Sequence, residues 1–194
     1  MEITVKKEDI VSALNTTLGV VEKRQTLPIL ANVLFEVNEN TFKITATDLE
    51  SEVTTSGSIL NLISPGKTTT SAKKLNELCR LIPDGEEINL SLNGNKLNIK
   101  TTNGKYSLST LPSTDFPIFD IDSGDSPLVI SAKDLRELIK NTSFAMGNQD
   151  WRHYLNGLYL AISDSEITAV TTDAHRLAVA NLLTQSDNSF SGII

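Results

Sequence analysis

The segment LPILANVLFEV (27–37) is matched later in the chain by RHYLNGLYLAI (152–162), at a constant shift of 125 residues. The apolar positions coincide under this shift, so that Leu30, for example, falls on Leu155. A single register held over more than forty residues indicates two copies of one structural unit. The other aligned pairs are VKKEDIVSAL (5–14) with ISAKDLRELI (130–139), and TATD (45–48) with VTTD (170–173).

Both copies predict a helix that is followed by antiparallel strands. In the second copy, Ser131 and Asp134 form an S-x-x-D capping box, and the apolar residues after it recur with the period of a helix. In the first copy, Pro28 marks a break, and the apolar, alternating segment after it predicts a strand. The expected helical stripes are Leu135, Leu138, Ile139 and Thr142 in the second copy, and Ile10, Leu14, Leu18 and Val21 in the first.

A further helix and a meander of strands are expected between the two copies. The segment KKLNELCRLI (73–82) has apolar residues at helical spacing, and three strand-like segments follow it. Asn93-Gly94 and Asn103-Gly104 predict type I′ hairpin turns, which require positive φ at both central positions. The first 111 residues therefore contain two rounds of helix followed by strands.

The segment LPSTDFPIFDIDSGDSP (111–127) holds three prolines and four aspartates, which is typical of a linker. We expect a complete first domain over residues 1–126, including this acidic linker near 111–126, and the N-terminal half of a second domain over residues 127–194. A full second copy would need about 120 residues. Only 68 follow position 126, so the sequence is expected to be a truncated piece of a longer protein.

The composition excludes several classes of protein. The chain has 194 residues, a net charge of −7 and a single cysteine, Cys79, so neither an internal disulfide nor a cysteine-rich metal site is expected. No apolar run is long enough to span a membrane and the N-terminus does not resemble a signal peptide, which favours the cytoplasm. Acidic residues gather in segments 36–52 and 112–127, and basic residues gather in 72–82. We expect no cofactor and no metal.

The stretch TTDAHRLAVA (171–180) places an aspartate, a histidine and an arginine close together, which raises the possibility of acid–base catalysis by Asp173 and His175. The sequence lacks a nucleophile elbow, a phosphate-cradling glycine loop and the spacing of a metal site. Asp173 also falls on Asp48 of the first copy, which predicts a structural role in a turn after a strand. We therefore expect no catalytic residue and no enzyme. A hydrolase that uses Asp173 and His175 is the least favoured interpretation of the chain.

Docking of a partner is the preferred interpretation of the same stretch. If the strands pair, Ala174, Leu155 and Leu177, with the aliphatic stems of Arg152 and Arg176, would line a shallow apolar cup with a polar rim. The alternative is ordinary core packing with surface arginines.

A different set of residues points to contact with DNA. Basic residues lie on the predicted helices, and loops at 23–25 and 149–154 occupy equivalent places in the two copies. Scattered contacts of this kind are enough for a binder that does not read sequence, although solvated helix faces are the alternative. The helical residues are Lys73, Lys74, Arg80, Lys133, Arg136 and Lys140.

Five segments in this order and spacing resemble the bacterial DNA polymerase III beta subunit family of replicative sliding clamps. They are RQTLPILANVLFEV, TATDLESEV, YSLSTLPSTDFP, RHYLNGLYL and TTDAHRLAV. The resemblance implies an α+β DNA-clamp fold, with domains built from repeated helix-plus-antiparallel-sheet halves. It further implies a processivity factor rather than an enzyme, in which two chains close head-to-tail into a ring around duplex DNA. The implied partners are duplex DNA, the DNA polymerase III catalytic subunit, the clamp-loader complex, and other polymerases and repair proteins that carry short clamp-binding peptides.

The resemblance also carries residue roles to this sequence. The implied peptide-binding residues are Arg152, Leu155, Thr172, Ala174, His175, Arg176 and Leu177. The implied DNA-binding residues are Arg24, Lys73, Arg80, Gln149, His153 and Tyr154, and the implied dimer interface includes Lys96, Lys105, Tyr106 and Leu108. Two positions depart from the family pattern, because Ala174 stands where relatives usually have glycine and His153 replaces a tyrosine.

The length of the chain is the departure that bears most on function. In the family, the ring interface and part of the peptide pocket come from regions beyond the first domain and a half, so the 194-residue chain is not expected to close the ring. A peptide-binding adaptor of the same fold, which never encircles DNA, is the alternative function.

Overall fold

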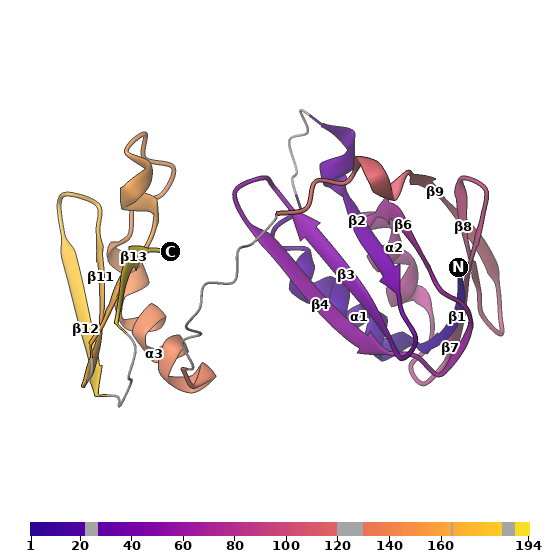
Figure 1. Cartoon of the computed structure of the whole chain (residues 1–194), viewed down its shortest axis with the longest axis horizontal. Coiled ribbons are helices and arrows are strands. Elements are labelled where there is room, and N and C mark those ends of the chain that lie inside the picture. The colour runs from indigo at the N-terminus through magenta and orange to yellow at the C-terminus, as the bar shows by residue number, and fades with distance from the viewer. Residues whose placement is uncertain (22–26, 120–129, 164, 184–188) are drawn as a thin grey trace. The chain divides into compact units, whose positions relative to one another are not determined.

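The computed structural model describes residues 1–21, 27–119, 130–163, 165–183 and 189–194. The chain divides into two compact units, which we call unit 1 (Met1–Asp120) and unit 2 (Ile121–Ile194) (Figure 1). No helix of the described residues is long and apolar enough to cross a membrane.

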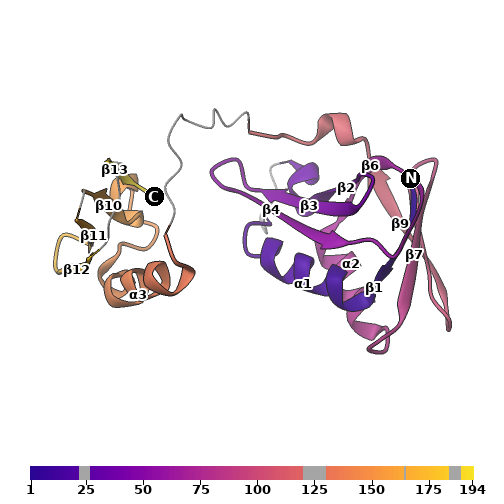
Figure 2. The same ribbon diagram turned by 60° about the horizontal axis from the view of Figure 1, so that its bottom comes forward.

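Unit 1 is a curved antiparallel sheet with its helices on one face. Over the described residues the strand order is β4-β3-β2-β6-β9-β8-β7-β1-β5. Helices α1 and α2 pack side by side against this sheet (Figure 2). The elements are β1 (Glu2–Lys6), α1 (Lys7–Thr17), η1 (Pro28–Ala31), β2 (Asn32–Val37), β3 (Thr41–Thr47), β4 (Glu52–Ser58), β5 (Asn61–Ser64), β6 (Gly66–Ser71), α2 (Ala72–Leu81), β7 (Glu87–Asn93), β8 (Lys96–Lys100), β9 (Lys105–Leu111) and η2 (Ser113–Asp115).

The core of unit 1 lies between the helices and the sheet. Phe35 and Phe42 stack with their ring centroids 5.3 Å apart, and both side chains are fully buried. The predicted helix over 73–82 is confirmed as α2, whose N-terminus is capped by the Ser71 hydroxyl. Burial of such side chains, rather than helix propensity, is the main source of stability for short helices of this kind.

Two local predictions in unit 1 need correction. The first helical stripe was expected to reach Val21, but α1 ends at Thr17, whose hydroxyl donates to the carbonyl of Ala13 at 3.2 Å. The residues beyond it still pack on the core, although they are not helical.

The predicted β7–β8 and β8–β9 hairpins are confirmed, but their turns are not type I′. Asn93 pairs with Lys96, so the loop is Gly94–Asn95, and of these two only Gly94 has a positive φ. The next loop spans four residues, because Lys100 pairs with Lys105. The Asn-Gly signal therefore located both hairpins and mispredicted their turn geometry.

Unit 2 repeats the first half of unit 1. Its strand order over the described residues, β12-β11-β10-β13, corresponds to β4-β3-β2-β6, and α3 covers the same face as α1. The bounds of α3, η4, β11 and β12 equal those of α1, η1, β3 and β4 shifted by 125 residues, which confirms the predicted repeat. The elements are α3 (Ala132–Thr142), η3 (Ser143–Ala145), η4 (His153–Asn156), β10 (Tyr159–Ile162), β11 (Glu166–Thr172), β12 (Leu177–Leu183) and β13 (Phe190–Ile193).

The segment predicted as a linker belongs in large part to unit 1. Leu111 ends β9, and Phe116 is buried with 5% of its surface exposed. The backbone amide of Phe119 donates to a carboxylate oxygen of Glu52 in β4 at 3.0 Å. The expected domain boundary at 126/127 falls in residues 120–129, which lie outside the described residues.

Candidate functional site

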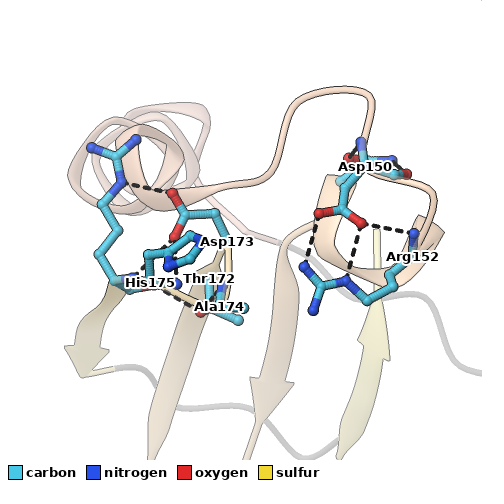
Figure 3. Close-up of polar contacts among 8 residues, drawn as sticks. Asp150, Arg152, Thr172, Asp173, Ala174 and His175 are labelled. Atoms are coloured by element: carbon cyan, nitrogen blue, oxygen red, sulfur yellow. Dashed lines mark hydrogen bonds and ion pairs between the residues drawn. The ribbon is translucent and has the colours of Figure 1, made fainter.

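The candidate site lies at one end of the sheet of unit 2. Strand β11 ends at Thr172 and pairs there with Leu177, the first residue of β12, so a tight turn joins the two strands. Strand β10 runs antiparallel to β11 and pairs Tyr159 with Val170, so the segment before β10 approaches the same end. Figure 3 shows the two groups of side chains above the strands, with the β11–β12 turn on one side and the loop before β10 on the other.

The β11–β12 turn is held by side chains that accept from its backbone. The Oδ1 atom of Asp173 accepts from the amides of His175 at 3.0 Å and Arg176 at 2.9 Å. The Thr172 hydroxyl accepts from the amide of Ala174 at 3.1 Å and donates to the carbonyl of Arg176 at 2.7 Å. These bonds fix a conformation in which Ala174 has φ +73°, a value that favours glycine.

The equivalent turn in unit 1 has the same construction. The Oδ1 atom of Asp48 accepts from the amides of Glu50 at 3.0 Å and Ser51 at 2.7 Å, and Thr47 accepts from the amide of Leu49 at 3.0 Å. Leu49 has φ +74°. The predicted structural role of the aspartate is therefore confirmed in both copies, because Asp173 uses its carboxylate to hold a turn.

The charged side chains of the turn are already partnered within it. The Nε atom of Arg176 donates to Oδ2 of Asp173 at 3.0 Å, and its guanidinium carbon lies 6.0 Å from the centroid of the Phe144 ring. The pKa of Asp173 is lowered, first by the amide of His175 and then by that of Arg176. An acidic carboxyl group held in this way is a poor proton acceptor, which argues against acid–base catalysis at this turn.

A second ion pair lies in the loop before β10. The carboxylate of Asp150 accepts from three nitrogens of Arg152: the backbone amide at 2.9 Å, Nε at 3.1 Å and Nη2 at 2.9 Å. The side-chain hydrogen bonds from Arg152 are the main cause that lowers the pKa of Asp150 to about 2, and the same bonds raise the pKa of Arg152. The guanidinium carbon also lies 5.7 Å from the ring centroid of Trp151.

The apolar residues expected to line the site differ in exposure. Leu155 is buried, with 6% of its surface exposed, and Leu177 is 62% exposed. His175 and Arg176 are exposed, and Arg152 is partly buried. The structure therefore brings the expected peptide-binding residues to one end of the sheet, with Leu177 as the main exposed apolar side chain among them.

The residues expected to contact DNA are distributed over both units. Lys73 and Arg80 are exposed on α2. The Nζ atom of Lys73 lies 3.9 Å from Oε1 of Glu77, and Nη2 of Arg80 donates to Oδ1 of Asn15 in α1 at 2.9 Å. Gln149, His153 and Tyr154 are exposed in the loop and η4 of unit 2. Gln149 has φ +57°. The remaining expected residue, Arg24, lies outside the described residues.

The expected dimer residues lie on two neighbouring strands of unit 1. Lys96 begins β8, and Lys105, Tyr106 and Leu108 lie in β9. Strand β9 pairs with β8 through residues 105–109, and it pairs with β6 only through residues 110 and 111. On the side away from β8, residues 105–109 therefore pair with no strand among the described residues, and an edge of this kind can accept another strand.

Sequence reasoning missed two residues of the site, Asp150 and Asn156. The amide of Asp150 donates to Oδ1 of Asn156 and the amide group of Asn156 donates back to the carbonyl of Asp150, both at 2.9 Å. The only signal in the sequence was the Asp-x-Arg spacing of Asp150 and Arg152. Such local side-chain bonds depend on the path of the loop, which the sequence pattern did not specify.

No cluster of His, Cys, Asp or Glu suited to a metal ion occurs among the described residues. The single thiol, Cys79, is buried in α2, and burial raises its pKa to about 12. A thiol in that state does not act as a nucleophile or a metal ligand near neutral pH.

Comparison with known proteins assigns both units. Residues 1–120 match the family model described as DNA polymerase III beta subunit, N-terminal domain, and residues 129–194 match the model of its central domain. The beta sliding clamp of Pseudomonas putida is 39% identical over 182 residues, which are 94% of this chain and 50% of that protein. The chain spans about half the length of the curated relatives it matches.

Solved structures agree with the sequence matches. A crystal structure of the DNA polymerase III subunit beta from Pseudomonas aeruginosa matches with a TM-score of 0.94 and 37% identity, covering 100% of this chain and 53% of that chain. A sliding clamp from the same organism, bound to griselimycin, matches with a TM-score of 0.93, 37% identity and the same coverage of both chains.

Proposed function

The chain belongs to the DNA polymerase III beta subunit family, and from this premise we propose that it forms part of a sliding clamp that encircles duplex DNA and tethers the replicative polymerase. The observation that carries the proposal is the internal repeat, in which the helix and strand bounds of unit 2 reproduce those of unit 1 and the whole chain matches a solved clamp subunit. A clamp of this kind holds other enzymes on DNA and performs no reaction of its own, so we infer no enzymatic activity.

The charge distribution supports contact with DNA through the helices. Basic residues outnumber acidic residues on both helices. On α2 the exposed Lys73, Lys74 and Arg80 stand against Glu77, and on α3 the exposed Lys133, Arg136 and Lys140 stand against Asp134 and Glu137. Contacts with phosphates need no sequence readout, and a closed ring would retain DNA by topology even though the net charge of the chain is −7. The residues proposed to contact duplex are Arg24, Lys73, Arg80, Gln149, His153 and Tyr154.

The ring itself is proposed to be a head-to-tail homodimer of the whole protein. The open edge of β9 in unit 1 supports this, because a free strand edge can extend a sheet across a subunit boundary. The proposed partners are duplex DNA, the DNA polymerase III catalytic subunit, the clamp-loader complex, and other polymerases and repair proteins with short clamp-binding peptides. The proposed location is the cytoplasm.

We further propose that partner peptides dock at the end of the unit 2 sheet. A comparison between the copies supports this site, because two outward positions at the start of β12 are apolar where the equivalent positions of β4 are polar. Leu177 takes the place of Glu52, and Val179 takes the place of Thr54. An exposed apolar strip with arginines at its rim suits a short peptide with apolar side chains. A relative of the same fold has been solved with griselimycin bound, so a clamp of this kind accepts a ligand.

A peptide titration tests the docking site. Trp151 is the only tryptophan, and it adjoins Arg152, so its emission should change in a saturable manner as a Gln-Leu-x-Leu-Phe peptide is added. A scrambled peptide should leave the emission unchanged. If circular dichroism shows a folded chain and neither peptide changes the emission, the residues of this chain do not form a docking site by themselves.

A duplex titration tests the DNA contacts separately. Binding of the chain to a labelled duplex should weaken with salt, and Lys73→Ala should reduce the slope of log affinity against log salt by about 1. Lys67→Ala provides the matched control, because Lys67 lies on β6 and pairs with Glu36. Equal slopes for the two variants would contradict the assignment of α2 as a DNA-facing helix.

A further inference from the structure

The loop before β10 is closed by hydrogen bonds at three levels. At its base, the amide of Gly147 donates to the carbonyl of Leu155 at 2.8 Å. In its middle, Asp150 and Asn156 exchange two hydrogen bonds through one backbone amide, one carbonyl and the Asn156 side chain. At its tip, the Asp150 carboxylate holds Arg152. The conformation of the loop therefore fixes where the guanidinium of Arg152 lies.

This arrangement has no chemical equivalent in the first copy. At the shift of 125 residues, the positions of Arg152 and Asn156 are occupied by Leu27 and Ala31, whose side chains carry no polar atoms. The short helix η1 forms in unit 1 with the same bounds as η4, shifted by 125, although these bonds cannot form there. The repeated fold therefore does not need the Asp150–Arg152–Asn156 arrangement, which points to a role specific to the surface of unit 2.

The Asp150 carboxylate holds the guanidinium of Arg152 in one orientation and leaves some of its N–H donors able to bind a ligand. A guanidinium has five N–H donors, and Asp150 engages Nε and Nη2, so the Nη1 group has no hydrogen-bond partner among the described residues. The guanidinium carbon lies over the ring of Trp151, 5.7 Å from its centroid, and Trp151 is 83% exposed. The side chains of Arg152 and Asp150 are 29% and 22% exposed, so solvent screens this pair less than an open surface pair.

We propose that Asp150 is a positioning residue of the docking site, which holds Arg152 in the orientation that a bound peptide meets. The inference rests on the proposed function, because it assigns Asp150 a role in the peptide site described above. An arginine that is already ordered loses less side-chain entropy when it forms a further hydrogen bond, and this raises the affinity for the peptide. Asp150 does not contact the peptide itself.

The first readout is independent of any peptide. In ¹H–¹⁵N NMR spectra, the Nε–H signal of Arg152 should be protected from exchange with water in the wild type, and Arg152→Lys assigns the signal by removing it. The signal should lose its protection in Asp150→Ala and in Asp150→Asn, because both variants remove the charged partner. Glu166→Gln, at the opposite end of β11, is the matched control and should leave the signal in place.

The second readout separates positioning of Arg152 from support of the loop. Asp150→Asn keeps an oxygen that can accept from the amide of Arg152 but loses the carboxylate, whereas Asp150→Ala loses both. Both variants should weaken binding of a labelled Gln-Leu-x-Leu-Phe peptide by roughly five- to twenty-fold, measured by fluorescence anisotropy. In an Arg152→Ala background, either change at Asp150 should alter the affinity by less than about twofold.

Each outcome has a distinct meaning. If the wild type does not bind the peptide, the proposed docking function fails. If the wild type binds and the Asp150 variants bind equally well, the docking function stands and the positioning role is wrong. If Asp150→Asn binds like the wild type and only Asp150→Ala is weakened, Asp150 supports the backbone of the loop and does not position Arg152, which also overturns the inference.

Discussion

The β3–β4 turn of unit 1 and the β11–β12 turn of unit 2 share a backbone and differ in their surfaces. In both turns a threonine and an aspartate accept from the following amides, and the third residue has φ near +74°. The next residues are Glu50 and Ser51 in one copy and His175 and Arg176 in the other. The Thr-Asp pair thus encodes the shape of the turn, and the residues after it are free to define a site.

The same contrast extends to the helices. Leu14 in α1 is fully buried beside α2, whereas its equivalent in α3, Ile139, is 42% exposed. No counterpart of α2 occurs in unit 2 among the residues that the structure describes. Each unit thus has its own core, and that of unit 2 is the smaller.

The largest effects are expected from cavities at equivalent core positions. Phe35→Ala in β2 should lower the free energy of unfolding of unit 1 by about 3–5 kcal/mol, and Leu160→Ala at the equivalent position of β10 should lower that of unit 2 by about 2–5 kcal/mol. Hydrogen–deuterium exchange resolved by peptide reports each unit separately. Each substitution should reduce protection in its own unit, and a loss in both units from either change would contradict two independent cores.

The next effect concerns the docking surface alone. Leu177→Glu installs the residue that unit 1 carries at Glu52, and it should weaken binding of the labelled peptide by roughly tenfold or more. Because Leu177 is 62% exposed, the free energy of unfolding should change by less than about 0.5 kcal/mol. Leu183→Ser, at the opposite end of β12, installs the residue that unit 1 carries at Ser58; it is the control and should leave the affinity unchanged. Equal affinities for the wild type and Leu177→Glu would remove Leu177 from the site.

The third effect probes the shared backbone of the two turns. Ala174→Gly and Leu49→Gly should each stabilise the folded chain by about 0.5–1 kcal/mol, because glycine adopts positive φ without steric cost. The control is Ala178→Gly in β12, which should destabilise it by a similar amount, since glycine weakens a strand. Urea denaturation measures all three, and a destabilising Ala174→Gly would show that the strained conformation is not the one the turn adopts in solution.

The repeated frame was predictable because it depends on local patterns. The shift of 125 residues, the capping serine at Ser131 and the turn aspartates Asp48 and Asp173 all follow from periodicity or from hydrogen bonds between near neighbours in sequence. These signals need no knowledge of the rest of the fold. The structure confirms the turn aspartates in both copies and the capping serine in unit 2.

The features that sequence reasoning missed depend on contacts distant in sequence or on a particular loop path. The Pro- and Asp-rich composition of 111–127 predicted a linker, but Phe116 is buried and the amide of Phe119 reaches Glu52, 67 residues earlier. The Asp150–Arg152 pair forms in a loop where Gln149 has positive φ, a conformation that no periodicity indicates. The comparison of the copies therefore predicted where the candidate site lies, and the hydrogen bonds within it became visible only in the structure.

The smallest effect is the pH dependence of that loop. Hydrogen bonds from Arg152 lower the pKa of Asp150 to about 2, below the value of about 3.9 expected in an unfolded chain. The Asp150–Arg152 ion pair therefore stabilises the folded loop fully above about pH 4, and this stabilisation is lost as the pH falls toward about 2. Protection of the Arg152 Nε–H signal should accordingly stay constant from pH 7 to about 4 and decline below it. Asp150→Asn should lack protection across the same range, and a decline in the wild type between pH 7 and 5 would mean that a different group controls the loop.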